Sequence, residues 1–351
     1  MATRRAFLAG LAAVVAPKPG WADAGSPACL AAGKRGAGYV LHGLSATGDS
    51  LFRIALPGRG HAAAAHPLRP QAVAFARRPG TFALVLDCVT GGVSHRLTPP
   101  AGRQFNGHGA FSADGAVLYT SEVVADTSEG RIGLWDTSDY SRAGEWGSGG
   151  IGPHDLKRLA DGALVVANGG IATDPRDRTK LNIDSMRPNL TRLDPDGRIV
   201  AQAELPRDYR QNSIRHLAIA GDGTVAFAMQ WEGDAADAVP LLGLWRAGDL
   251  HLCPVPEDQA QRMQGYAGSI AVAADGRIAL TSSHGGVVMI HAADGTHLAT
   301  HARADISGVA AVGAGFMASD GSGALWRCDV AGLQPLTSGG PAWDNHLIAL
   351  G

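Results

Sequence analysis

The chain has 351 residues, and its 30 lysines and arginines nearly balance 32 aspartates and glutamates, which gives a formal net charge of −2. This balance lacks the basic excess that neutralises phosphates, so nucleic acid is not expected as a partner. Hydrophobic residues make up 45% of the chain and charged residues 18%, which excludes a disordered protein. The 48 glycines are roughly twice the usual share and indicate many tight turns between short strands.

The first 24 residues have the pattern of an export signal. Arg4 and Arg5 precede an apolar stretch from Phe7 to Ala16, and Ala22-Asp23-Ala24 offers a cleavage site between small residues. A membrane anchor is the alternative, but this stretch is about half the ~20 apolar residues of a spanning helix. The sequence therefore predicts twin-arginine export to the periplasm, cleavage near Ala24, and a mature chain (25–351) with no membrane span.

The four cysteines, Cys29, Cys88, Cys253 and Cys328, contain no C-x-x-C pair, which argues against a clustered zinc or iron-sulfur site. An oxidising compartment allows disulfides, and three pairings are open. Small buried hydrophobic side chains are the favoured interpretation for at least two of them.

One pattern recurs along the chain: a short apolar strand, a turn ending in glycine, and a second apolar strand. It occurs at 72–86, 107–121, 155–167, 216–231, 269–282 and 308–319. Most of the turn glycines recur at intervals near the about 40–50 residues of a four-stranded propeller blade. Second hairpins follow, for example at 190–203 around Asp194-Pro195-Asp196-Gly197 and at 287–301 around Asp294-Gly295, because glycine adopts the positive φ of primed turns.

The two ends of the chain complete a further blade. The last apolar run, 344–350, has no partners after it, whereas the runs 39–44 and 51–56 have no innermost neighbour. Joining them closes the ring and removes open sheet edges. We therefore predict an all-β, seven-bladed propeller of four-stranded blades over residues 25–351, with six or eight blades as alternatives.

In such a ring, first-strand starts and second-strand ends meet at one mouth, and polar residues gather at both places. The first-strand starts supply His108, His154 with Asp155, Arg215 with His216, and Asn345 with His346, and the second-strand ends supply Glu122, Asn168, Gln230, Glu232, His284 and Asp320. Imidazole is a common ligand of transition metals, which predicts a mouth that binds a metal such as iron or copper, or an anionic cofactor, through His108, His154, His216, His284 and His346. Hydrogen bonding of these groups to neighbouring backbone is the alternative.

Two details qualify this mouth. His154 lies eight residues before its turn glycine, whereas His108 and His216 lie seven before theirs, so His154 faces the axis only if a bulge restores the alternation. The other eight histidines are expected in outer strands or loops, exposed to solvent: His42, His61, His66, His95, His251, His291, His297 and His301.

The longest interruption of the repeats, residues 171–188, is rich in charge and is expected to form a lid over the mouth. Arg176, Arg178, Lys180 and Arg215 are predicted to hold a carboxylate or phosphate, with Asn168 and Gln230 as neutral contacts. A solvated loop with internally paired charges is the alternative.

Several short motifs together resemble a known family: Gly107-His108-Gly109, Gly152-Pro153-His154, 166–171 (VANGGI), Lys180-Leu181-Asn182 with Met186 and Pro188, and 213–217 (SIRHL). The chain resembles the domain-of-unknown-function 1513 family over nearly its whole mature length. The resemblance implies a twin-arginine-exported propeller whose activity is not established. Members are often encoded beside imelysin-type iron-uptake proteins and a haem-containing oxidoreductase, which implies partners in periplasmic iron handling. Asp174 stands where that pattern has a His before Pro, which weakens direct metal binding by the lid, and Asp155 stands where the pattern has Glu.

Three functions follow as hypotheses. The first is a metal- or ligand-binding accessory factor of iron or other transition-metal acquisition, in which Glu122 and Glu232 join the histidines. The second is a metal-dependent lactonase- or lyase-like enzyme, with His108 or His154 as general acid or base and Arg215 holding a substrate anion. The third is a protein-interaction platform without chemistry at the axis.

Overall fold

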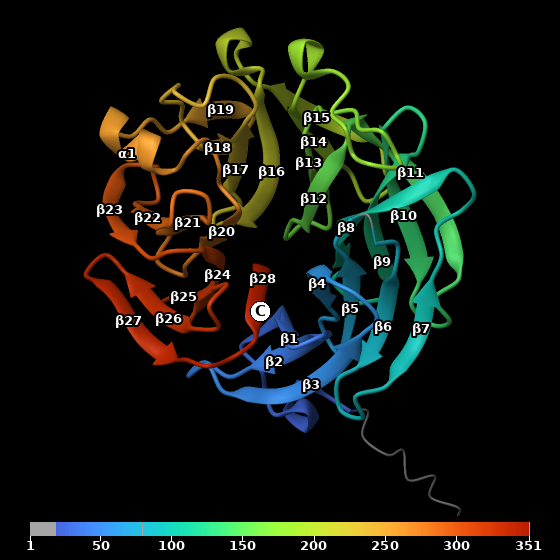
Figure 1. The fold of residues 1–351 in the computed structure, drawn as a ribbon. Coiled ribbons are helices and arrows are strands. Elements are labelled where there is room, and N and C mark those ends of the chain that lie inside the picture. The colour runs from blue at the N-terminus through green and yellow to red at the C-terminus, as the bar shows by residue number, and fades with distance from the viewer. Residues whose placement is uncertain (1–18, 79, 351) are drawn as a thin grey trace, which may run out of the picture.

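The computed structural model describes residues 19–78 and 80–350. The predicted signal residues Arg4 and Arg5 lie outside the described residues. Seven four-stranded antiparallel sheets surround a central axis (Figure 1). The prediction of a seven-bladed all-β propeller is confirmed.

Each blade runs from an innermost strand beside the axis to an outermost strand, and the blades are named here by their strands. Two blades are β4 (Gly60–Ala65), β5 (Gln71–Ala76), β6 (Ala83–Asp87), β7 (Val93–Leu97), and β8 (Arg103–Phe111), β9 (Val117–Val124), β10 (Glu129–Asp136), β11 (Arg142–Ile151). The next two are β12 (Pro153–Arg158), β13 (Leu164–Asn168), β14 (Asn189–Leu193), β15 (Ile199–Glu204), and β16 (Asn212–Ile219), β17 (Val225–Trp231), β18 (Leu242–Arg246), β19 (Asp249–Leu252). Two more are β20 (Ser269–Val272), β21 (Ile278–Ser282), β22 (Val287–His291), β23 (His297–Ala302), and β24 (Ile306–Val312), β25 (Gly315–Asp320), β26 (Leu325–Asp329), β27 (Gly332–Thr337).

The last blade is shared by the two ends of the chain, as predicted. Its innermost strand is β28 (Ala342–Ala349), which pairs with β1 (Cys29–Arg35), and β2 (Gly38–Leu44) and β3 (Ser50–Leu56) complete the sheet. Closure from both termini gives each end strand a hydrogen-bonded neighbour and leaves no gap in the ring (Figure 1).

Short helices lie outside the sheets: η1 (Trp21–Ala24) precedes β1, η2 (Ile183–Ser185) lies in the loop between β13 and β14, and η3 (Arg207–Tyr209) and α1 (Glu257–Arg262) lie in connections between blades. In the described part of the chain, no helix has the length and apolar character needed to cross a membrane. The predicted cleavage position near Ala24 lies at the end of η1.

The core lies between neighbouring blades. The second strands supply the largest buried side chains, Phe75, Phe227 and Phe316, each at most 1% exposed. The close approach of Phe75 requires a glycine at position 109, because a Cβ there would lie 2.7 Å from the Phe75 ring. Face-to-face packing of neighbouring blades thus forms the core of the ring.

All four cysteines are buried and unpaired, so the interpretation as small buried hydrophobic side chains is confirmed over the disulfide alternative. Burial raises the pKa of each thiol to about 12. These thiols are therefore neutral and poorly nucleophilic at physiological pH.

Candidate metal centre

The innermost strands carry bulges at their polar residues. Pairing with the second strand is interrupted between Gly60 and Ala63 in β4, between Phe105 and Gly109 in β8, and between Pro153 and Leu156 in β12. Similar irregularities occur next to His216 in β16 and opposite 344–346 of β28. A bulge inserts a residue and changes the direction of the side chains around it. The bulge that His154 required is therefore present, and each bulge contains or adjoins a histidine.

Five histidines from five blades meet at the axis, and we call them the axial histidines: His61, His108, His154, His216 and His346. The ring centroid of His108 lies 4.9, 4.7, 5.8 and 5.1 Å from those of the other four, in chain order. The outer four also approach one another, at 4.7 Å for three neighbouring pairs and 5.6 Å for His61 and His154. His108 is therefore at the centre of the group.

Two sets of three axial histidines have the spacing of a metal site. They are His61, His108 and His154, and His108, His216 and His346; in each set the ligand nitrogens lie within 4.8 Å of one another. Nitrogens bound to one tetrahedral metal at about 2.0–2.1 Å are separated by roughly 3.4 Å. Modest ring rotations therefore suffice to bring either set onto a shared ion, and His108 belongs to both.

Four of the axial imidazoles, those of His61, His154, His216 and His346, are held in the neutral form that binds metals. Burial, followed by the neighbouring imidazoles and Arg77 or Arg215, places the pKa of His61 and His154 well below the ordinary value of 6.5. The pKa of His216 and of His346 is lowered in the same direction, again chiefly by burial. Each of these four rings therefore keeps a nitrogen lone pair at neutral pH.

Asp155 fixes the orientation of the central ring. Its Oδ1 lies 3.3 Å from His108 Nδ1, and its Oδ2 accepts a hydrogen bond of 3.0 Å from the Leu217 amide. Burial raises the pKa of Asp155, but Lys157 and His108 outweigh it, so the net pKa lies well below its usual range and the carboxylate is charged. A carboxylate that accepts a hydrogen bond from Nδ1–H leaves the lone pair of His108 on Nε2, and this nitrogen lies within hydrogen-bond distance (3.2 Å) of His61 Nε2.

Several axial nitrogens have no partner. Across residues 19–78 and 80–350, His61 Nδ1, His154 Nδ1 and His346 Nε2 are buried without a hydrogen bond. A buried polar atom that is left unsatisfied costs about 1–3 kcal/mol. These atoms are not explained by the alternative of backbone hydrogen bonding, and they fit a site that gains its partners by binding.

The axial histidines separate two cavities along the central channel. On the side where β12 begins, a cavity of about 220 Å³, which we call the mouth cavity, is lined by His61, His154 and His216. On the other side, a wider cavity of about 500 Å³ is lined by His108, His216 and His346, with Trp21 near its rim. The cluster is thus accessible from both ends of the channel.

The loop 171–188 contributes to the mouth cavity. Thr173, Arg178 and Lys180 line it, together with Arg215 and Gln230 from β16 and β17. Glu232 also lines the cavity, where it forms an ion pair with Lys180 and lies 4.0 Å from Arg215.

Four predicted site residues lie elsewhere. Arg176 is 90% exposed and does not line the mouth cavity. Asn168 is fully buried and donates to Ser148 O (2.8 Å) and Asn189 Oδ1 (3.0 Å), so it joins adjacent strands. His284 stacks on Tyr266, with 3.9 Å between ring centroids, and does not join the axial histidines.

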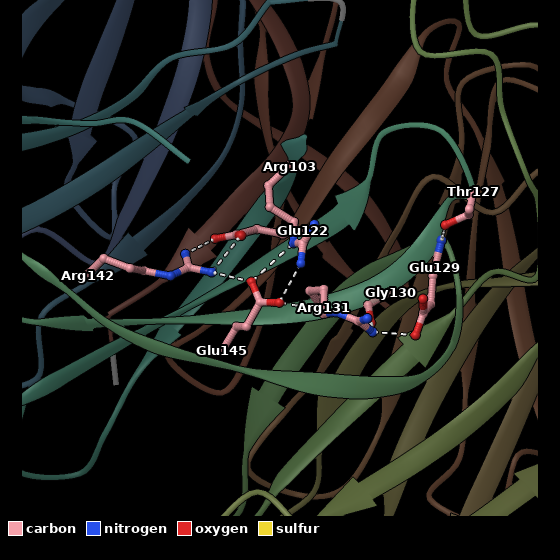
Figure 2. Close-up of polar contacts among 8 residues, drawn as sticks. All are labelled: Arg103, Glu122, Thr127, Glu129, Gly130, Arg131, Arg142 and Glu145. Carbon is pink, nitrogen blue, oxygen red and sulfur yellow. Dashed lines mark hydrogen bonds and ion pairs between the residues drawn. The ribbon is translucent and has the colours of Figure 1, made fainter. Parts of the chain in front are cut away.

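Glu122 is the fourth misplaced residue, and the prediction that it joins a mouth site is wrong. It is fully buried in the β8–β11 blade, where Arg142 donates to both of its oxygens, at 2.6 and 3.0 Å (Figure 2). Glu145 extends this network to Arg103 and Arg131. Glu122 is not the last residue of its strand, because β9 continues to Val124, and its neighbour Val123 lines the mouth cavity instead.

Asp320, which was also expected at a second-strand end, is likewise a structural residue. Its carboxylate accepts hydrogen bonds from Arg303, Ser322 and the Trp326 indole.

The expectation that eight histidines are outer and solvent-exposed is wrong for four of them. His61 is an axial histidine and 9% exposed, and His42, His66 and His291 are at most 3% exposed. His42 bonds Ser50 at 2.8 Å, and His291 bonds the Gly295 carbonyl at 3.0 Å, so these two are satisfied structural groups.

Arg77 and Arg78 are further cavity residues that were not predicted from the sequence. They were missed for the same reason as His61. The hairpin at 72–86 is β5 and β6, the second and third strands of its blade, and not the first and second. The first strand is β4, which begins at Gly60, so His61 occupies a first-strand start and Arg77 and Arg78 follow a second-strand end. The rule that located the other site residues applies to these three once the strands are counted correctly.

The fold and its axis define a class: a seven-bladed propeller with a five-histidine cluster in its central channel. The chain belongs to the family described as protein of unknown function (DUF1513), whose model matches residues 54–350. No curated protein sequence matches the chain.

Solved structures resemble the chain in fold. Hydrazine synthase of Kuenenia stuttgartiensis has a TM-score of 0.58 at 13% identity, over 86% of this chain and 90% of that one. A streptogramin B lyase structure gives 0.57 at 14% identity, over 79% and 82% of the two chains. A chain of a mitotic checkpoint complex gives 0.56 at 11% identity, over 80% and 78%. At such identities the likeness concerns the propeller alone.

Proposed function

We propose that this protein binds a transition-metal ion through the axial histidines. The observation that carries the proposal is the convergence of five imidazoles from five separate blades, four of them buried and that of His154 half-buried. Three of the five have a buried nitrogen with no partner in the described chain. Gathering these groups is costly for folding, since each buried polar atom gives up its water. A bound metal ion supplies the compensating interaction.

The donor set favours particular metals. Imidazole nitrogen suits iron, copper, zinc and nickel, whereas calcium and magnesium prefer oxygen ligands. Asp155 behind His108 adds the carboxylate support that commonly orients a metal-bound histidine. Iron and copper are the ions that we put first.

The proposed setting is the periplasm, reached by twin-arginine export, where the protein would act as an accessory factor of iron or other transition-metal acquisition. Imelysin-type and haem-containing iron-uptake proteins are the proposed partners. The support for this setting is the twin-arginine pattern at Arg4 and Arg5 and the neighbourhood of related genes that the family resemblance implies.

Titration calorimetry tests metal binding directly. Chelator-treated protein is titrated with Cu²⁺, Zn²⁺ and, without oxygen, Fe²⁺, and binding near one equivalent is expected. The double variant His108→Ala, His216→Ala disrupts both histidine sets and should abolish it. His284→Ala is the matched control, since this histidine stacks on Tyr266 outside the cluster. Equal binding by the two variants would refute the assignment to the axial histidines.

A further inference from the structure

The mouth cavity has an excess of positive charge. Five basic side chains line it: Arg77, Arg78, Arg178, Lys180 and Arg215. One carboxylate, Glu232, lines it as well, and Glu232 is already paired with Lys180. Asp344 lies behind the wall, 3.7 Å from Arg77, and also pairs with Arg59 at 2.5 Å.

Two of these guanidinium groups lack a counter-charge. Arg78 donates to the neutral oxygens Asn106 Oδ1 (3.0 Å) and Thr173 Oγ1 (3.1 Å), and Arg178 lies 3.5 Å from the Arg78 carbonyl. Over the described ranges 19–78 and 80–350, neither forms an ion pair. Burial lowers the pKa of Arg78 to about 10, and repulsion from Arg178 and Arg215 adds to the shift. The cavity therefore holds positive charge that an anion would stabilise.

A third guanidinium is also incompletely satisfied. Arg215 is 17% exposed, and its Nε is buried without a hydrogen-bond partner among the described residues. An unused buried donor beside unpaired charges indicates that an acceptor belongs there.

The loop is built to keep Arg178 over the cavity. Arg178 has φ of 68°, a left-handed conformation that is unfavourable for a residue with a side chain. Asn182 ties the two arms of the loop together, with Nδ2 donating to Gly170 O (2.9 Å) and Oδ1 accepting from the Ala172 amide (2.7 Å). These hydrogen bonds across the loop hold the strained residue in place, as at many ligand sites.

We propose that the mouth cavity is a binding site for a small dianion, with Arg78, Arg178 and Arg215 as its main contacts. Guanidinium groups bind carboxylate and phosphate oxygens with two parallel hydrogen bonds, so either chemistry fits. The volume of about 220 Å³ lies below the range of about 300–1,000 Å³ for drug-sized ligands, which restricts the ligand to a small molecule. Asn345, which donates to the Tyr266 hydroxyl at 3.1 Å, offers further polar contact.

The site does not depend on a bound metal, although the two would be adjacent. His61, His154 and His216 form the side of the cavity that faces the axis, so an anion held by the arginines would lie next to the axial histidines. The anion site is therefore tested on metal-free protein.

The experiment is titration calorimetry of chelator-treated protein with succinate, citrate and inorganic phosphate in separate runs. Saturable binding of at least one is expected, and comparing the three distinguishes a carboxylate site from a phosphate site. Arg78→Ala should weaken binding about 10- to 100-fold, because a hydrogen bond to a charged group is lost. Arg178→Gly should weaken it similarly while folding normally, since glycine tolerates the positive φ.

Arg246→Gln is the matched control, because it removes the same charge from an exposed pair with Asp222 remote from the mouth. This variant should bind the anion like the unchanged protein. The proposal is overturned if none of the three anions binds, or if Arg78→Ala and Arg178→Gly bind as tightly as Arg246→Gln. Metal binding is scored separately, so failure of the anion site and failure of the metal centre are distinguishable.

Discussion

Replacing an axial histidine by leucine should stabilise the metal-free protein while weakening its metal site. His346 is 5% exposed and its Nε2 has no partner in the described chain. His346→Leu removes this unsatisfied atom, which costs about 1–3 kcal/mol, and retains a side chain of similar size. A chain of this length has an entropy of unfolding of roughly 0.7 kcal/mol per degree, so a gain of this size should raise Tm by about 1–4 °C.

The assay is thermal unfolding followed by circular dichroism in the presence of chelator. His291→Leu is the matched control, because His291 is equally buried but bonds the Gly295 carbonyl at 3.0 Å. Loss of that partner should lower Tm by a similar amount. If His346→Leu instead destabilises the metal-free protein as much as His291→Leu does, the axial histidines are structural and the reasoning fails.

Three further predictions concern other parts of the molecule. Glu122→Gln should lower the free energy of unfolding by about 3 kcal/mol, because it breaks a buried pair with Arg142, without changing metal stoichiometry; urea unfolding checks this. Gly107→Ala should weaken metal binding measured by calorimetry, since φ is 95° and the added Cβ would lie 2.6 Å from the His61 ring. Tm should fall as pH drops from 6.5 toward 4, because burial lowers the pKa of His42 and of His291 from 6.5 to about 4, so the unfolded chain binds more protons.

Each of these predictions has a contrary result. Unchanged urea stability of Glu122→Gln would mean that Arg142 and Glu145 suffice for the network in Figure 2. Unimpaired metal binding by Gly107→Ala would show that the His61 ring position is not needed. A flat Tm between pH 6.5 and 4, or one unaffected by His291→Leu, would contradict the assignment of His291 as buried and neutral.

The fold was predictable because its signals are local. Turns such as Asp194-Pro195-Asp196-Gly197 fix hairpins without reference to the rest of the chain, and unmatched strands at the two ends required the closure seen between β1 and β28. The alanine-rich β4 has weak strand propensity and was not predicted. As a result, β5 was taken for the first strand of its blade, although it is the second.

The candidate site was predictable in part. Position near the start of an inner strand identified four axial histidines, but His61 required the missing β4. A position near the end of a second strand did not place Glu122 and Asn168 in the mouth, because their side chains instead bond Arg142 and Ser148. The direction of a side chain depends on the local register of its strand, which a strand-end position does not define. Bulges, which aim the axial histidines, involve pairing between strands and have no reliable signature in one sequence.

The central claim is that the axial histidines hold a metal ion in the native protein. Native protein purified from its own organism, analysed by elemental mass spectrometry and X-ray absorption, tests this most directly. We predict about one equivalent of iron or copper in an all-nitrogen, imidazole shell that disappears in the His108→Ala, His216→Ala variant. Less than about a tenth of an equivalent of any transition metal, or a metal content unchanged in that variant, would contradict the account.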